Sequence, residues 1–345
     1  AAGMNRFRHR DVVIPLLFFT FPLAVAFAGP SPNGSEGKEL PVLRRSFAGG
    51  GEKVPPFPEG RFEPRAGGTI SWIGGSEVAD LDRHPFLESA IQRTWPDRKL
   101  RMRNLAWQGD TVYYQARPRY FYTQEKDSQP GSLADHRERT EPGIVFLAFG
   151  KMESLDGAER LPDFVAAYAK LLDDLSPLTG RLVLVRPTPF FRSGPAADLA
   201  DERNTVLDTY ARTIRTLAEE RGLRYLDLPT DEWDAKMSDN GVHLNEAGHR
   251  LFAAKVLAAL GKPDAAREEP PAALRDAILR KNLLWQQYYR PSNWAFLFGD
   301  RQHVPASRDP KNRDERWFVR EIDVLPGLIA EAENDIHRYA GETAK

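Results

Sequence analysis

The chain has 345 residues, which is enough for one large domain or two small ones. Its composition, 41% hydrophobic, 10% aromatic and 28% charged, is typical of a globular protein. A formal net charge of −1 argues against the basic surface that nucleic-acid-binding proteins carry, so we expect no nucleic-acid partner. The absence of cysteine excludes disulfides, thiolate metal sites and cysteine nucleophiles.

The first 28 residues have the three parts of a secretory signal peptide. Arginines at positions 6, 8 and 10 precede an apolar run over residues 12–27, and Ala26-Phe27-Ala28 forms an A-x-A cleavage signal. Translation is expected to start at Met4. Because the apolar run is shorter than the ~20 residues of a transmembrane helix, we expect cleavage, with an uncleaved membrane anchor as the alternative. The mature protein is then exported, periplasmic or extracellular, and has no membrane span.

Composition divides the remaining chain into three parts. Residues 29–68 are rich in Gly, Pro and Ser and are expected to form a flexible linker. Residues 69–262 alternate short apolar runs with longer amphipathic ones, which is the pattern of βα units. Residues 263–345 depart from this alternation and are expected to form a C-terminal helical extension.

The alternating region predicts an α/β fold, a three-layer α/β/α sandwich with a five-stranded, mainly parallel sheet. Strands are expected over Thr69–Ile73, Leu100–Asn104, Ile144–Phe149, Leu182–Val185 and Tyr225–Leu228. Helices are expected over Leu87–Thr94, Leu161–Leu175, Glu202–Arg221, Asn245–Leu260, Ala272–Tyr289 and Leu325–Tyr339. The stretch Arg290–Asn312 is expected to be irregular.

Four polar or glycine-containing segments are predicted to converge at one edge of this sheet. In an open α/β sheet, ligands bind beyond the carboxyl ends of the strands. Three segments follow the first three strands, and the fourth precedes the last helix of the sheet region. They are Gly74-Gly75-Ser76, Gln108-Gly109-Asp110-Thr111, Gly150-Lys151-Met152-Glu153 and Asn240-Gly241-Val242-His243.

In this order the four segments resemble the blocks of the SGNH (GDSL) hydrolase family, which are Gly-Asp-Ser, Ser-Gly-Asp-Thr, Gly-x-Asn-Asp and Asp-x-x-His. The resemblance covers about residues 65–262 and implies a lipase-like serine esterase that needs no cofactor and no metal. It suggests acyl or acetyl esters as substrates, carried by small molecules or carbohydrates.

The resemblance implies a role for each matched residue. Ser76 would be the nucleophile, because a serine hydroxyl acts when an adjacent base, here His243, takes its proton. The backbone N–H groups of Ser76 and Gly109 would form an oxyanion hole. We expect Ser76 Oγ and a ring nitrogen of His243 within hydrogen-bonding reach, about 2.6–3.2 Å, with some loosening when no substrate is bound.

Two positions depart from the family pattern. Met152 stands where the family has the Asn that completes the oxyanion hole, and losing one such donor lowers the rate by about 10²–10³. Asn240 stands where the family has the Asp that orients the histidine, and an Asp→Asn change of this kind costs about 10⁴ in a serine protease. Asp239 or a backbone carbonyl could orient His243 instead. Glu153 and Ser154 receive no role.

These departures keep a second reading open, in which the chain is a catalytically inactive SGNH-like domain that binds carbohydrate or a protein partner. In a third reading the protein is a scaffold whose tail does the binding. Ser76 alone could be a helix cap. We expect His249 on the outer face of its helix and Arg186 at the surface.

The tail contains aromatic residues and a second resemblance. Trp285, Tyr288, Tyr289 and Trp294 are expected to form the packing face of the extension, with a sugar-binding face as the alternative. Residues 290–301 resemble a C-terminal extension of SGNH-like proteins from planctomycete-type bacteria.

Overall fold

The computed structural model describes Phe47 and residues 52–58, 61–115, 140–266, 268–297 and 301–343. The predicted signal peptide, residues 1–28, lies outside the described residues.

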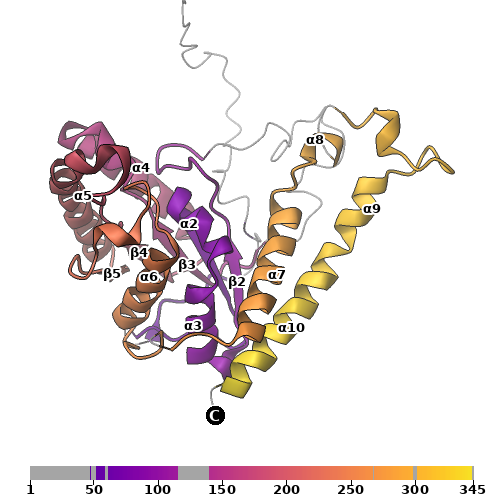
Figure 1. Cartoon of the computed structure of the whole chain (residues 1–345), viewed down its shortest axis with the longest axis horizontal. Coiled ribbons are helices and arrows are strands. Elements are labelled where there is room, and N and C mark those ends of the chain that lie inside the picture. Colours follow the sequence, from indigo (N-terminus) through magenta and orange to yellow (C-terminus); the bar gives the residue numbers. More distant parts are fainter. Residues whose placement is uncertain are drawn as a thin grey trace, which may run out of the picture. The chain divides into compact units, whose positions relative to one another are not determined.

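The central sheet has five parallel strands in the order β2-β1-β3-β4-β5 (Figure 1). The strands are β1 (Thr69–Gly74), β2 (Arg101–Asn104), β3 (Ile144–Ala148), β4 (Leu182–Val185) and β5 (Arg224–Leu226). In the register of the central strands, Ile70 of β1 lies opposite Met102 of β2 and Ile144 of β3. The predicted α/β fold is confirmed, and every strand pairing within this sheet is parallel.

Helices cover both faces of the sheet. The longer ones are α3 (Phe86–Thr94), α4 (Leu161–Leu175), α5 (Ala200–Glu220), α6 (Glu246–Ala259), α7 (Ala272–Tyr289) and α10 (Leu325–Thr343). The short ones are α2 (Ser76–Asp80), α8 (Trp294–Leu297) and α9 (Trp317–Asp323). The 3₁₀ segments are η2 (Leu81–Arg83), η3 (Pro96–Arg98), η5 (Glu153–Asp156), η6 (Ala158–Arg160), η7 (Gly194–Leu199), η8 (Ala235–Met237) and η9 (Pro305–Ser307). In the described part of the chain, no helix is both long enough and apolar enough to cross a membrane.

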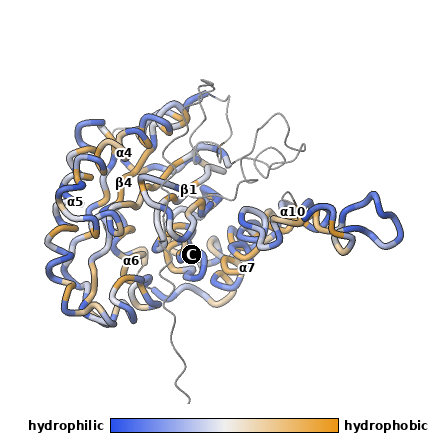
Figure 2. Tube along the Cα trace, turned by 90° about the horizontal axis from the view of Figure 1, so that it is seen from above, coloured by the Kyte–Doolittle hydropathy of each residue, from blue (hydrophilic) through white to orange (hydrophobic). Residues whose placement is uncertain are grey.

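The two-residue period of a strand sorts the core into two layers. Val145 and Leu147 of β3 pack with α4 and α5 on one face of the sheet, whereas Ile144 and Phe146 pack with α3 and α6 on the other. All four side chains are buried. Figure 2 shows β4 as hydrophobic along its length, as expected of a strand covered on both faces. Burying each such side chain stabilises the fold by about 1.5–3 kcal/mol, so the sheet and its helices form one cooperative core.

The C-terminal extension packs against the edge of the sheet at β2. Helices α7 and α10 lie side by side next to this strand (Figure 1). Side chains of the two helices contact four carbonyl groups of the strand and its flanks: Lys281 Nζ to Met102 O at 3.3 Å, Trp285 Nε1 to Asn104 O at 2.8 Å, Tyr289 Oη to Leu105 O at 3.3 Å, and His337 Nε2 to Leu100 O at 2.9 Å. An edge strand leaves backbone groups unpaired, and here side-chain donors satisfy them.

Several described residues in the segment predicted to be a linker contact the domain. Phe47 and Phe62 are buried in the hydrophobic core, and Val54 exchanges backbone hydrogen bonds with Leu178 and Gly180. Apolar burial thus fixes these points of a stretch whose Gly, Pro and Ser content predicts flexibility. The predicted domain boundaries stay predictions.

Candidate active site

Ser76 lies directly beyond the carboxyl end of β1 and begins helix α2. Gly74, the last residue of β1, is closely packed against β3, because a Cβ added there would lie 2.5 Å from Ala148 O. Only glycine fits so close a backbone approach. The chain then turns through Gly75, the N-cap of α2, and presents Ser76 half-buried at the sheet edge.

The loop after β2 meets Ser76. The backbone N–H of Gly109 donates a hydrogen bond to Ser76 Oγ at 3.3 Å. Gly109 has φ +84°, a left-handed conformation that favours glycine, and a Cβ placed on it would meet no atom within 4 Å. The space that a side chain would fill at Gly109 is therefore open, so nothing on this residue obstructs the approach of a substrate.

The segment after β3 supports the site through Glu153. Its buried carboxylate accepts hydrogen bonds from Gly150 N at 2.8 Å and Val112 N at 2.7 Å, and so ties this segment to the Gly109 loop. Burial raises the pKa of Glu153, while the two backbone N–H groups act to lower it. The adjacent Met152 is 40% exposed, and a thioether has no N–H to donate.

Lys151 connects three of the four segments. Its buried ammonium group donates to Glu77 Oε1 at 2.6 Å, to Thr188 Oγ1 at 3.1 Å and to the carbonyl of Val242. Glu77 follows Ser76 in the chain, and Val242 precedes His243. Burial lowers the pKa of Lys151, and the Glu77 carboxylate acts to raise it. This buried ion pair fixes the histidine loop relative to the serine turn.

In the histidine loop, Asn240 and Asp239 bind groups other than the imidazole. Asn240 Oδ1 accepts hydrogen bonds from the backbone N–H groups of Val242 at 3.0 Å and His243 at 2.8 Å. Asp239 Oδ1 accepts one from Asn245 Nδ2 at 2.9 Å. Within residues 140–266 and the other described ranges, no hydrogen bond links either side chain to the His243 ring.

Among the described residues, the charged group that lies within 4.0 Å of the His243 imidazole is the carboxylate of Asp80, the last residue of α2. The distance from His243 Nδ1 to Asp80 Oδ2 is 3.9 Å. No hydrogen bond joins Ser76 to His243 in the described structure, so the expected reach of about 2.6–3.2 Å is not met by a formed bond. Catalytic hydrogen bonds are often long before substrate binds. The assignments of Ser76, Gly109, His243, Asp239, Asn240 and Met152 stay predictions.

Sequence comparison with protein families decides the class. Residues 74–251, just over half of the chain, match the model of the GDSL-like lipase/acylhydrolase family. The chain belongs to this family. It is therefore a hydrolase that acts on ester bonds.

Solved structures similar to this GDSL-like hydrolase include two bacterial or metagenomic enzymes. Axe2, an acetylxylan esterase from Geobacillus stearothermophilus, is 19% identical, with a TM-score of 0.42 over 58% of this chain and 97% of the other. LAE5, an α/β hydrolase enzyme from the metagenome of Lake Arreo, Spain, is 20% identical, with a TM-score of 0.41 over 58% of this chain and 98% of the other. No curated protein matches the sequence.

The C-terminal extension of this GDSL-like hydrolase contacts the segments next to the candidate site. Gln286 Nε2 donates to Asp82 Oδ2 at 3.0 Å, directly after α2, and the Arg290 guanidinium lies 5.8 Å from the ring centre of Trp107 in the Gly109 loop. Trp285 and Tyr289 stack at 5.2 Å and are buried, as is Tyr288, so the predicted packing face is confirmed for these three aromatic residues.

The structure also gives the surroundings of His249 and Arg186, two side chains that were expected at the surface. His249 is not on the outer face of its helix: it is only 2% exposed and stacks on His84 with ring centres 3.9 Å apart. Helix α6 packs against α3, and this contact buries the ring. Burial lowers the pKa of His249 to about 3. Arg186 is 17% exposed and pairs with Asp208 at 2.5 Å.

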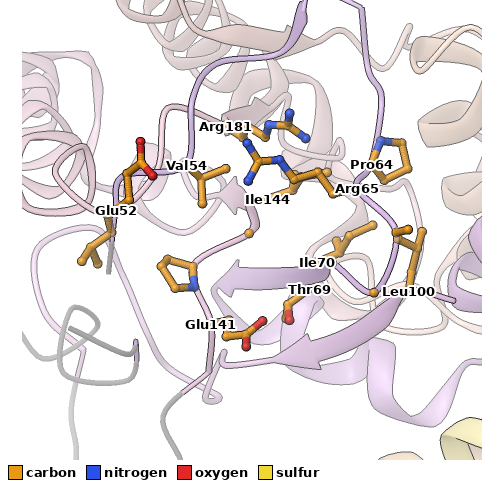
Figure 3. Close-up of a pocket in the computed structure, with 16 residues that line it drawn as sticks. Glu52, Val54, Pro64, Arg65, Thr69, Ile70, Leu100, Glu141, Ile144 and Arg181 are labelled. Atoms are coloured by element: carbon orange, nitrogen blue, oxygen red, sulfur yellow. The ribbon is translucent and has the colours of Figure 1, made fainter. Parts of the chain in front are cut away.

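A pocket of about 350 Å³ lies at the opposite end of the sheet, beside the amino ends of β1 and β3 (Figure 3). Two of its charged side chains have partners: Arg181 donates to Pro55 O and Glu63 O, and Glu141 accepts from Arg101. None of the predicted catalytic residues lines this pocket.

Proposed function

We propose that the chain cleaves acyl or acetyl esters, including O-acetyl groups of carbohydrates, with Ser76 as nucleophile and His243 as base. The observation that carries the proposal is the 3.3 Å hydrogen bond from Gly109 N to Ser76 Oγ beyond β1. It supports the proposal because a nucleophile and an oxyanion donor must face the same reacting carbonyl. The His243 ring lies near Asp80, which belongs to the same short helix as Ser76, and this ring would supply the base.

The reaction would follow serine acyl transfer. Ser76 Oγ attacks the ester carbonyl carbon while His243 takes the hydroxyl proton, and the oxyanion that forms accepts from the N–H groups of Ser76 and Gly109. Collapse of this tetrahedral intermediate breaks the bond between the carbonyl carbon and the alcohol oxygen, and the alcohol leaves with the proton from His243. Water, deprotonated by His243, then releases the acid and restores Ser76. Met152 adds no donor, so we expect turnover below that of a family member with Asn at this position.

We further infer that the protein is exported and that the mature chain begins at Gly29. The basic n-region, the apolar run and the Ala26-Phe27-Ala28 site support this inference. Mass spectrometry of periplasmic or secreted material should find a mature N-terminus at Gly29. Recovery of the intact chain from the cytoplasm alone would contradict export. The likeness of residues 290–301 to planctomycete-type extensions stays a prediction.

Two observations favour the inactive, carbohydrate- or protein-binding reading. Met152 offers no donor, and the Asn240 amide oxygen accepts from the loop backbone instead of the His243 ring. Turnover of short-chain nitrophenyl esters and acetylated sugars separates the two readings. The esterase proposal predicts measurable hydrolysis that Ser76→Ala abolishes. Absence of turnover by the folded parent protein, together with affinity for carbohydrate, would establish the binding reading instead.

A further inference from the structure

We propose that Asp80 is the positioning carboxylate of His243 and takes the place that the family gives to an Asp at position 240. The inference rests on the proposed function. Its starting point is the 3.9 Å separation between His243 Nδ1 and Asp80 Oδ2. Nδ1 is shielded from solvent and has no hydrogen-bond partner in the described structure. A buried, unpaired ring nitrogen beside a carboxylate is a strong indication that the two groups pair.

The exposure of the ring gives its orientation. The His243 side chain as a whole is 40% exposed although Nδ1 is shielded, so solvent reaches the rest of the ring, which includes Nε2. Asp80 is 18% exposed. The imidazole therefore directs Nδ1 inward to Asp80 and leaves Nε2 as the nitrogen that can receive a proton from a nucleophile.

Helix α2 places the nucleophile and the carboxylate on one face. Ser76 and Asp80 are four residues apart, so their side chains are neighbours along the helix surface. The loop after β2 contacts both: Gly109 N reaches Ser76 Oγ at 3.3 Å, and Gln108 Nε2 reaches Asp80 Oδ1 at 3.5 Å. Gln108 leaves Oδ2 of the carboxylate to face His243.

The acidic side chains of the neighbouring segments are engaged elsewhere. Asp239 accepts from Asn245, and Glu77 pairs with Lys151. The ammonium group of Lys151 bonds the Val242 carbonyl rather than the imidazole. Arg83 lies 4.0 Å from Asp80 but is 72% exposed, so solvent screens its charge. Asp80 is thus the carboxylate available to His243.

The pairing has a simple consequence for the reaction. A charge-assisted hydrogen bond between Nδ1–H and a carboxylate is about 2.7–2.9 Å long, so a side-chain movement of about 1 Å would form it. With Nδ1 protonated, Nε2 is the lone-pair nitrogen that accepts the Ser76 proton. Asp80 would hold the ring in this tautomer and stabilise the imidazolium that forms.

The test uses the full-length protein with ¹⁵N-labelled histidine. Asp80→Asn removes the charge, and Asp174→Asn, on a carboxylate of similar exposure (21%) near the end of α4, is the matched control. NMR of the ring nitrogens should show His243 as the Nδ1–H tautomer in the parent and in Asp174→Asn, and a loss of this preference in Asp80→Asn. A parent His243 in the Nε2–H form, or a tautomer that Asp80→Asn leaves unchanged, would overturn the proposal.

Kinetics provide the second readout and separate this proposal from the proposed function. Asp80→Asn should lower kcat by about 10²-fold or more with little change in KM, because an orienting carboxylate acts on the chemical step. Asp174→Asn should stay within about threefold of the parent, and Asp80→Asn combined with Asn240→Asp should recover part of the loss. A parent without turnover whose His243 tautomer still responds to Asp80→Asn would refute the esterase and retain the pairing. An active parent whose kcat is unaffected by Asp80→Asn would refute the positioning role alone.

Discussion

Gly109 donates its backbone N–H to the hydroxyl of Ser76 across 3.3 Å, and this contact joins two segments that are 33 residues apart in the chain. The donor depends on a left-handed backbone at Gly109, and the acceptor depends on the tight turn between β1 and α2. The conformations of these two loops therefore decide whether the Gly109 N–H and the Ser76 hydroxyl face each other, as the proposed ester hydrolysis requires.

Gly109→Ala should lose activity out of proportion to stability. A Cβ at φ +84° costs about 1–2 kcal/mol. Gly261, with φ +81° at the end of α6 and likewise no atom within 4 Å of an added Cβ, is the matched control. We expect both alanine variants to lower the free energy of unfolding in urea similarly. Only Gly109→Ala should also lower kcat/KM, by about 10-fold or more. Equal kinetic effects of the two changes would contradict the role of the Gly109 N–H.

Lys151→Met should destabilise the protein strongly. It leaves the Glu77 carboxylate without its 2.6 Å partner in a largely buried place, and removing one member of such a pair costs about 3 kcal/mol. Because Glu77 is 22% exposed, the loss should lie at the low end of the range for buried pairs. Glu77→Gln in the same chain should recover part of the stability. Urea unfolding of the two single variants and the double variant checks this coupling, and strictly additive effects would rule it out.

Met152→Asn should increase turnover. The new amide N–H restores the donor that the family has at this position, and one such donor is worth about 10²-fold in kcat. The side chain is 40% exposed, so the change should leave the thermal midpoint unaltered. Leu155→Asn, a change at a 43% exposed position in the adjacent turn, is the control for reduced surface hydrophobicity. If kcat rises equally in both variants, the gain does not come from an oxyanion donor.

His249 should make the protein sensitive to acid well above the pH at which carboxylates titrate. Its pKa is about 3 in the folded protein and 6.5 in the unfolded chain, so the unfolded state binds a proton first as pH falls. The stability is present above pH 6.5 and is lost progressively towards pH 3. At pH 5 the loss should amount to about 2 kcal/mol.

His249→Phe keeps a ring to stack on His84 but removes the titrating group. Urea unfolding at pH 7 and pH 5 should show a smaller loss of stability in this variant than in the parent, by about 2 kcal/mol. Parallel pH dependence of the two proteins would show that His249 is protonated in the folded state.

Local patterns predicted the sheet and its order of segments because the strand signal is contained within each element. The run Ile144–Phe149 is apolar at every position, and both of its faces are in fact covered. The predicted position of His249 was wrong because α6 is apolar around most of its circumference, so no polar stripe marks an outer face. The Lys151 contacts join residues 74 and 91 positions apart, which no local spacing reveals. No local pattern marks Asp80 as a partner of His243, and only the folded chain brings the two side chains to 3.9 Å.

Reaction of the purified, full-length protein with a fluorophosphonate probe, followed by mapping of the labelled residue, tests the central claim most directly. The probe phosphonylates a serine hydroxyl that an adjacent base activates, whichever ester is the natural substrate. Ser176→Ala, at the end of α4, is the matched control for Ser76→Ala. The esterase account predicts one label on Ser76, its loss in Ser76→Ala and its retention in Ser176→Ala. A folded parent protein that stays unlabelled, or carries the label on another serine, would contradict it.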